Sequence, residues 1–162
     1  MYKQVEIDAT SKEVFYNLLQ KQVRSLLVGE TDPVANMANI AALLYQALDS
    51  INWAGFYRNM GNELLLGPFV GVPACVHIAL GRGVCGSCAE QMKSIIVDNV
   101  HEFPGHIPCD GASNSEIVIP LVKNDILYGV LDIDSPILNR FDNGDKAGLE
   151  EVVRIFLDCT AF

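Results

Sequence analysis

The sequence lacks the features that mark membrane, secreted and nucleic-acid-binding proteins. No apolar run approaches the ~18 residues that a membrane-spanning helix needs, and the opening MYKQVEIDAT has no apolar core of the kind found in secretion signals. Basic residues are few: 11 Lys and Arg stand against 20 Asp and Glu, and 11 − 20 gives a net charge of −9. Such a surface repels nucleic acid and anionic bilayers. We therefore expect a cytoplasmic protein that binds neither.

The chain also lacks repeats, linkers and low-complexity segments. Its 162 residues, 50% of them hydrophobic and 19% charged, fit one globular domain over 1–162. A domain of this size buries roughly 70% of the surface that its unfolded chain exposes, so it folds without disulfides. The five cysteines therefore need another explanation. In a reducing compartment such cysteines are usually buried, metal-bound or catalytic.

Hydrophobic periodicity predicts how the chain divides into helices. Thr10 and Glu13 have the spacing of a capping box, and Asp32 followed by a proline is typical of a capped helix start. Apolar residues at helical intervals then predict helices over 10–29 and 32–50, a short helix toward Met92, and a last helix that opens at Asp142.

A hydrophobic period of two predicts the strands. Six strands are expected, over 51–58, 63–67, 75–80, 94–97, 115–122 and 126–134. Gly67-Pro68 is expected to interrupt the second of them. The order ααβββαβββα, with sequential strands adjacent and antiparallel, predicts an α+β sandwich. This is one mostly antiparallel sheet of about six strands with helices packed against it.

A long loop over 98–114 holds the first candidate for chemistry. Long loops tend to be functional, and Cys109 lies in this one among proline, glycine and small polar residues. These neighbours leave its thiol partly exposed, as a reactive thiolate requires. The alternative is a loop cysteine with no role. Cys75 and Cys85 lie upstream, and either could close a disulfide with Cys109 as a resolving thiol.

Cys85 and Cys88 form a CxxC pair, which is typical of zinc sites and of thioredoxin-like redox centres. A structural zinc site would need further ligands, and His101 and His106 have an accepted ligand spacing. A thioredoxin-like motif is expected after the first strand of a βαβ unit, whereas this pair follows an antiparallel run. Both readings of the pair stay open.

Carboxylates form the other concentration of functional groups. Glu116 begins one predicted strand, while Asp132 and Asp134 share a face at the end of its hairpin partner. Like charges held together raise one another's pKa, so one carboxyl could stay protonated near neutrality and act as a proton donor. The alternative is a solvated strand end. Trp53 and Tyr57 share one face of their strand and form either an apolar wall beside these acids or ordinary core packing.

Seven motifs, in chain order, closely resemble those of the free methionine-(R)-sulfoxide reductases, which are GAF-type domains. The motifs are NWAGFY, LLLGPF, PAC, GRGVCG, DNVHEFPGHIPCD, SNSEIVIPL and GVLDIDSP. The resemblance runs from about Thr10 to Phe141, and the spacing of three cysteines matches the family's. It implies a GAF-type sandwich. The chain differs from the family at Cys88, where a small residue is more usual.

The resemblance also implies a reaction and a set of residues. Cys109 is the implied nucleophile, Cys85 the main resolving thiol and Cys75 a second one. Six further residues are assigned to the substrate: Trp53 and Tyr57 to its methyl group, Asp98 to its amino group, and Glu116, Asp132 and Asp134 to the sulfoxide.

The implied reaction is reduction of free methionine-(R)-sulfoxide through a cysteine sulfenic acid and an intramolecular disulfide. Thioredoxin is the implied reductant, in a role in oxidative stress, and no cofactor or metal is expected. A monomer and a homodimer both stay open. The alternative function is a non-catalytic GAF-type sensor that binds a small ligand, and a zinc-binding redox switch is a third.

Overall fold

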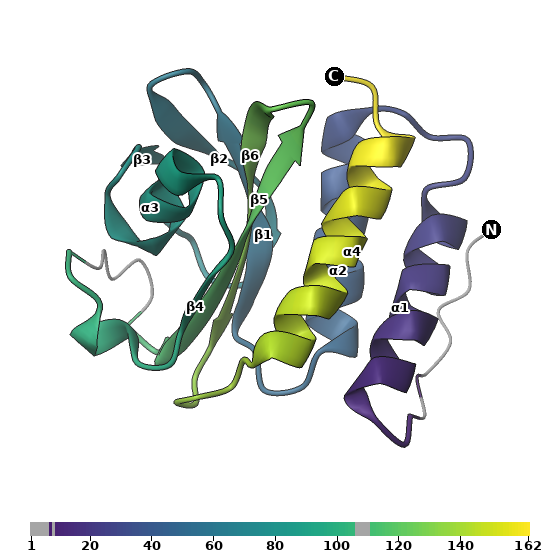
Figure 1. Ribbon diagram of the computed structural model, residues 1–162, viewed down its shortest axis with the longest axis horizontal. Coiled ribbons are helices and arrows are strands. Elements are labelled where there is room, and N and C mark those ends of the chain that lie inside the picture. The colour runs from purple at the N-terminus through teal and green to yellow at the C-terminus, as the bar shows by residue number, and fades with distance from the viewer. Residues whose placement is uncertain (1–6, 8, 106–110) are drawn as a thin grey trace.

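A computed structural model describes residues 7, 9–105 and 111–162 (Figure 1). The elements follow the predicted order. They are α1 (Lys12–Leu26), α2 (Pro33–Ala47), β1 (Trp53–Asn59), β2 (Glu63–Val70), β3 (His77–Ala79), α3 (Gly83–Gln91), β4 (Ile95–Val97), the 3-10 helix η1 (Val100–Glu102), β5 (Ser115–Lys123), β6 (Ile126–Ser135) and α4 (Asn143–Cys159).

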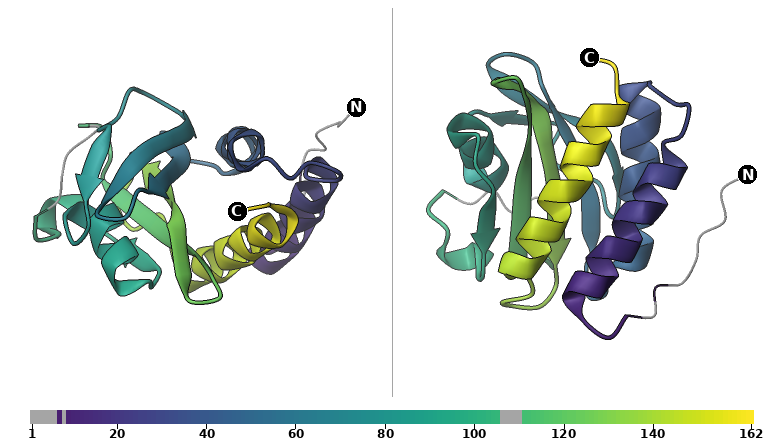
Figure 2. Two further views of the ribbon diagram at one scale, coloured as in Figure 1. Left: turned by 90° about the horizontal axis from the view of Figure 1, so that it is seen from above. Right: turned by 45° about the vertical axis from the view of Figure 1, so that its right-hand side comes forward.

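All six strands form one antiparallel sheet in the order β3-β2-β1-β6-β5-β4. Helices α2 and α4 cover one face, while α3 lies on the other (Figure 1). Helix α1 packs beside α4, as both views in Figure 2 show. The predicted α+β class is therefore confirmed. Among the described residues, no helix has the length and apolar character needed to cross a membrane.

Alternation along the strands divides the buried residues into two cores. On β1, Ala54 and Phe56 face the layer of α2 and α4 and belong to the larger core. Trp53 and Tyr57 point to the opposite face and pack with residues of α3 and η1. Because side chains alternate with a period of two, the functional residues of neighbouring strands share the α3 face only while the register holds.

Side-chain caps explain the starts of α1 and α2. Asp32 accepts a hydrogen bond from the backbone N–H of Ala35 at 2.8 Å, as predicted for α2. The predicted cap of α1 is wrong by one residue. The hydroxyl of Ser11, not that of Thr10, accepts a hydrogen bond from the backbone N–H of Val14 at 3.2 Å. Ser11 stands three residues before Val14, whose N–H has no acceptor within the first turn of the helix.

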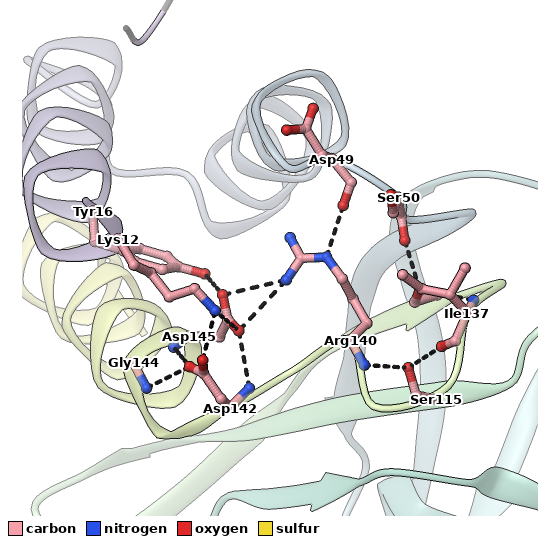
Figure 3. A network of polar contacts seen from close by, with 11 residues as sticks. Lys12, Tyr16, Asp49, Ser50, Ser115, Ile137, Arg140, Asp142, Gly144 and Asp145 are labelled. Atoms are coloured by element: carbon pink, nitrogen blue, oxygen red, sulfur yellow. Dashed lines mark hydrogen bonds and ion pairs between the residues drawn. The ribbon is translucent and has the colours of Figure 1, made fainter. Parts of the chain in front are cut away.

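A buried carboxylate ties α1 to the start of α4 (Figure 3). Asp145, only 1% exposed, accepts hydrogen bonds from Tyr16 Oη at 2.9 Å and Lys12 Nζ at 2.7 Å. It also completes the capping box with Asp142, which opens α4 as predicted. Burial, together with the Asp145 charge, raises the pKa of Tyr16. This network holds the helix layer together on the side away from α3.

The second strand differs from its prediction. Gly67-Pro68 does not interrupt β2, which continues to Val70. The pairing with β1 instead shifts register between Gly55 and Tyr57, and this bulge absorbs the irregularity. The third strand is shorter than predicted, so Cys75 lies just before β3 rather than on it.

Candidate active site

A cavity of about 40 Å³ lies on the α3 face of the sheet. Six residues singled out in the sequence line it: Trp53 and Tyr57 from β1, Cys85 from α3, Glu116 from β5, and Asp132 and Asp134 from β6. The structure thus brings together a thiol, three carboxylates and two aromatic rings from four elements.

Strand register places the three carboxylates on one face. Glu116 is paired with Asp134 across β5 and β6, and Asp132 lies two residues before Asp134 on the same face. Asp132 is also paired with Gly55 of β1. Glu116 and Asp132 are only 5% and 7% exposed, so these acids are buried rather than part of a solvated strand end.

Burial and mutual repulsion keep protons on this cluster. Burial raises the pKa of Glu116 well above its usual range, and the charges of Asp132 and Asp134 raise it further. Burial likewise raises the pKa of Asp132 to about 6, against hydrogen bonds with Cys85 and Glu116 that lower it. Near neutrality the cluster therefore holds a proton that it can give to a bound oxygen.

The Cys85 thiol points at these acids. Its Sγ donates to Oε1 of Glu116 at 3.9 Å from the first turn of α3. Burial raises the pKa of this thiol well above its usual range, and the charges of Asp132 and Glu116 add to the effect. Cys85 is therefore a protonated thiol in this state, and a protonated thiol is a poor nucleophile.

Cys88 lies one turn further along α3 and turns away from the acids. Its side chain is fully buried, and its Sγ donates to the carbonyl oxygen of Val118 at 3.6 Å. Burial is the main cause that raises its pKa. The two thiols of the CxxC pair thus have different environments.

The aromatic rings form a fixed wall. Trp53 Nε1 donates to the carbonyl of Val72 at 3.1 Å, and Tyr57 Oη donates to the carbonyl of Cys75 at 3.0 Å. Their rings stack with centroids 6.0 Å apart. Because both polar atoms are bonded to the segment before β3, the rings supply apolar surface to the cavity.

Gly55 leaves the space that the Trp53 ring of this aromatic wall occupies. A Cβ at this position would lie 2.3 Å from Cβ of Phe69 and 2.6 Å from the outer edge of the Trp53 indole. No side chain fits there, so the absence of a Cβ lets the indole stack on Phe69 at 5.3 Å between centroids.

The other site residues predicted from the sequence are not among the described residues that line this cavity. Asp98 is exposed after β4 and is not part of the cavity wall; its carbonyl accepts a hydrogen bond from Asn139. Its contact with the substrate amino group stays a prediction. Cys109 lies outside the described residues. Cys75 is disulfide-bonded, whereas Cys85 carries a free thiol. The roles that the resemblance gives these two cysteines stay predictions.

Of the predicted zinc ligands that the structure describes, Cys85, Cys88 and His101 do not form a common group. The His101 ring contacts the side chain of Asn114 on the surface, and His106 lies outside the described residues. In the described part of the chain, potential metal ligands gather within 4.8 Å of one another only at Cys85, Glu116 and Asp132.

Two polar residues of the wall, Ser113 and Arg82, escaped the sequence-based prediction. Ser113 is buried and accepts a hydrogen bond from Asn52 at 3.0 Å, and Arg82 precedes α3 at the edge of the cavity. Ser113 lies in the long loop and is the first residue of the SNSE motif, which could have drawn attention to it. Arg82 stands inside GRGVCG, one of the motifs that carry the family resemblance.

The raised pKa of Asp132 predicts how stability depends on pH. Between 3.8 and about 6 the folded state binds a proton that the unfolded state has lost, so the free energy of unfolding falls as pH rises. Denaturation at pH 4 and pH 7 should therefore show that Asp132→Asn gains stability relative to the wild type as the pH rises, by about 1–3 kcal/mol. The exposed Asp49→Asn is the control, and an equal gain in it would contradict the prediction.

Comparison with known proteins identifies the class. The GAF domain family matches residues 32–156. The free methionine-R-sulfoxide reductase of Escherichia coli is 49% identical over 143 residues, which cover 88% of this chain and 87% of the relative. The protein of the same name from Saccharomyces cerevisiae is 40% identical over 153 residues, 90% of this chain and 85% of the relative.

A solved structure agrees with the sequence relatives. The free methionine-R-sulfoxide reductase of Neisseria meningitidis, solved in complex with its substrate, superposes with a TM-score of 0.93. It is 39% identical and covers 98% of this chain and 95% of its own. The chain therefore belongs to the GAF-domain family, in the branch that contains the free methionine-R-sulfoxide reductases. The resemblance seen in the sequence is confirmed.

Proposed function

We propose that this protein reduces free L-methionine-(R)-sulfoxide to L-methionine. The observation that carries the proposal is the cavity, in which the buried acid pair Glu116 and Asp132 faces a thiol and an aromatic wall. The relatives of this name, at 49% and 40% identity over most of the chain, support the same reaction.

The residues suggest how the first half of the reaction runs. Cys109, assigned by the resemblance and outside the described residues, attacks the sulfoxide sulfur as a thiolate. A protonated carboxyl of the Glu116 and Asp132 pair gives its proton to the sulfoxide oxygen. The attack forms a bond between Cys109 Sγ and the substrate sulfur. As the protonated oxygen transfers from the substrate sulfur to Cys109, both this bond and the S–O bond of the sulfoxide break. Methionine leaves with its sulfur lone pair restored, and Cys109 is left as a sulfenic acid. The aromatic rings offer the methyl group an apolar contact.

A second thiol completes the oxidation. It condenses with the sulfenic acid to a disulfide and releases water, so one sulfoxide is reduced while two thiols are oxidised. The bonded state of Cys75 supports Cys75, rather than Cys85, as the thiol that closes on Cys109. Cys75 is well placed for this role, because its carbonyl is anchored by Tyr57 at the cavity wall.

The resolving thiol can be identified by substitution. In Cys75→Ser, one turnover should survive because it needs only the nucleophile, but recycling by a dithiol reductant should slow by about tenfold or more. Cys85→Ser is the matched comparison, and its recycling should change less. Rapid-quench measurement of methionine separates the two phases. If Cys85→Ser loses recycling and Cys75→Ser keeps it, the assignment is wrong.

An external dithiol must then restore the two thiols. Thioredoxin is our proposal for this reductant, as the resemblance implies, because thiol–disulfide exchange with a dithiol regenerates both cysteines without a cofactor.

Selectivity for the free amino acid follows from the small, acid-lined cavity. A free ammonium group can pair with carboxylates there, whereas a sulfoxide inside a peptide has no such charge to offer. The test is an assay of methionine formation from the separate R and S epimers, beside an N-acetylated, C-amidated analogue. We expect turnover of the free R epimer alone. Binding of methionine sulfoxide without turnover would instead indicate a ligand sensor.

A further inference from the structure

We propose that the protein binds one Zn²⁺ ion between Cys85, Glu116 and Asp132, and that this ion closes the cavity to substrate. The second half of this statement rests on the proposed function. The first half does not, because it concerns metal binding alone.

The geometry of the three side chains carries the inference. Their ligand atoms lie within 4.8 Å of one another, and the Cys85 Sγ to Glu116 Oε1 distance is 3.9 Å. In a tetrahedral zinc site, a thiolate sulfur at ~2.3 Å and a carboxylate oxygen at ~2.1 Å from the ion are about 3.6 Å apart. Shifts of about 1 Å in the side chains therefore complete a three-ligand site.

A second observation points to a ligand at the same place. Asp132 is 7% exposed and lines the cavity, yet within the described residues its Oδ1 has no hydrogen-bond partner. A buried carboxylate oxygen without a partner is costly, and a cation in the cavity would satisfy it. The structure thus supplies three ligand groups close together and, on one of them, a buried oxygen without a hydrogen-bond partner.

The charges favour a divalent ion that binds sulfur. A thiolate and two carboxylates would carry three negative charges in a buried space, which protons on these groups now offset. Zn²⁺ would replace those protons, with the Cys85 thiol proton and any carboxyl proton released to solvent. The sulfur ligand favours zinc over Mg²⁺ and Ca²⁺, which take oxygen ligands. No electron is transferred in this step.

The ion would occupy the reaction space. Three protein ligands leave a fourth zinc position open to the cavity, where water or another small group binds. The Glu116 and Asp132 oxygens would then be held by metal and could not protonate a sulfoxide. Zinc binding requires Cys85 as a free thiol, as it is here. A disulfide between Cys75 and Cys109 would leave this thiol free.

Co²⁺ is the probe for the test, since it replaces Zn²⁺ in such sites and is coloured. The reduced full chain is titrated with Co²⁺ and then with Zn²⁺ as competitor. We expect one Co²⁺ per chain, a sulfur-to-cobalt charge-transfer band, and visible bands typical of four-coordinate cobalt. Zn²⁺ should abolish them. Cys85→Ser should remove the charge-transfer band, and Glu116→Gln should weaken binding about tenfold or more.

Cys88→Ser is the matched control, because Cys88 belongs to the same CxxC pair but its thiol donates a hydrogen bond to the carbonyl oxygen of Val118. It should bind Co²⁺ as the wild type does. The proposal is overturned if wild-type protein shows no charge-transfer band, if Cys85→Ser keeps it, or if Cys88→Ser loses it. The titration needs no turnover, so an inactive protein that binds cobalt as expected refutes the proposed function while supporting the metal site.

Discussion

Cys109→Ser should lower methionine sulfoxide reduction by at least about three orders of magnitude, because a hydroxyl is a far weaker nucleophile than a thiolate and cannot carry the sulfenic acid. Methionine production under saturating substrate and reductant measures the loss. Even the first turnover should be absent, which distinguishes a missing nucleophile from slow recycling.

Cys159→Ser provides the matched control for that loss. Cys159 is a free thiol at the end of α4, on the helix layer that covers the opposite face of the sheet from the cavity. Its replacement should leave turnover unchanged. Substantial activity in Cys109→Ser would show that another residue attacks the sulfoxide.

Glu116→Gln should lower kcat by about 10²–10⁴-fold, since a positioned general acid contributes that much and an amide has no proton to give. The pH profile makes the test sharper. A general acid must be protonated, so the wild-type rate should fall as pH rises through the raised pKa of Glu116. Glu116→Gln should lose this fall together with most of its rate.

Two further variants complete this experiment. Asp132→Asn reports whether the other member of the acid pair donates the proton, because only the variant of the true donor loses the high-pH decline. Glu150→Gln replaces an acid on the exposed side of α4 and should behave as the wild type does. An unchanged pH profile in both cavity variants would exclude the pair as the proton source.

Most of the fold could be predicted from the sequence because the local sequence signals agree with the tertiary structure. The caps of α2 and α4 and the strand alternation around Trp53 all predicted what the structure contains. The errors have local causes. A proline and a glycine in β2 are tolerated because a bulge opposite them shifts the register, and sequence patterns do not report such a bulge.

The candidate site was predicted in part. Strand periodicity alone placed Asp132 and Asp134 on one face, and register then set Glu116 beside them. The direction of each thiol on α3 could not be predicted in this way. The spacing of Cys85 and Cys88 suggests a joint role, yet both pack against β5 with different partners. The Cys85 thiol donates a hydrogen bond to the carboxyl group of Glu116, and the Cys88 thiol donates one to the backbone carbonyl of Val118. Such differences depend on packing between elements far apart in the sequence.

The most direct test of the central claim is a single-turnover experiment on the reduced protein with excess free methionine-(R)-sulfoxide and no reductant. Methionine is quantified by chromatography, thiols by titration, and the disulfide by peptide mass mapping. The account predicts one methionine per chain, the loss of two thiols, and a bond between Cys75 and Cys109. Methionine formed without loss of thiols, or no methionine at all, would contradict it.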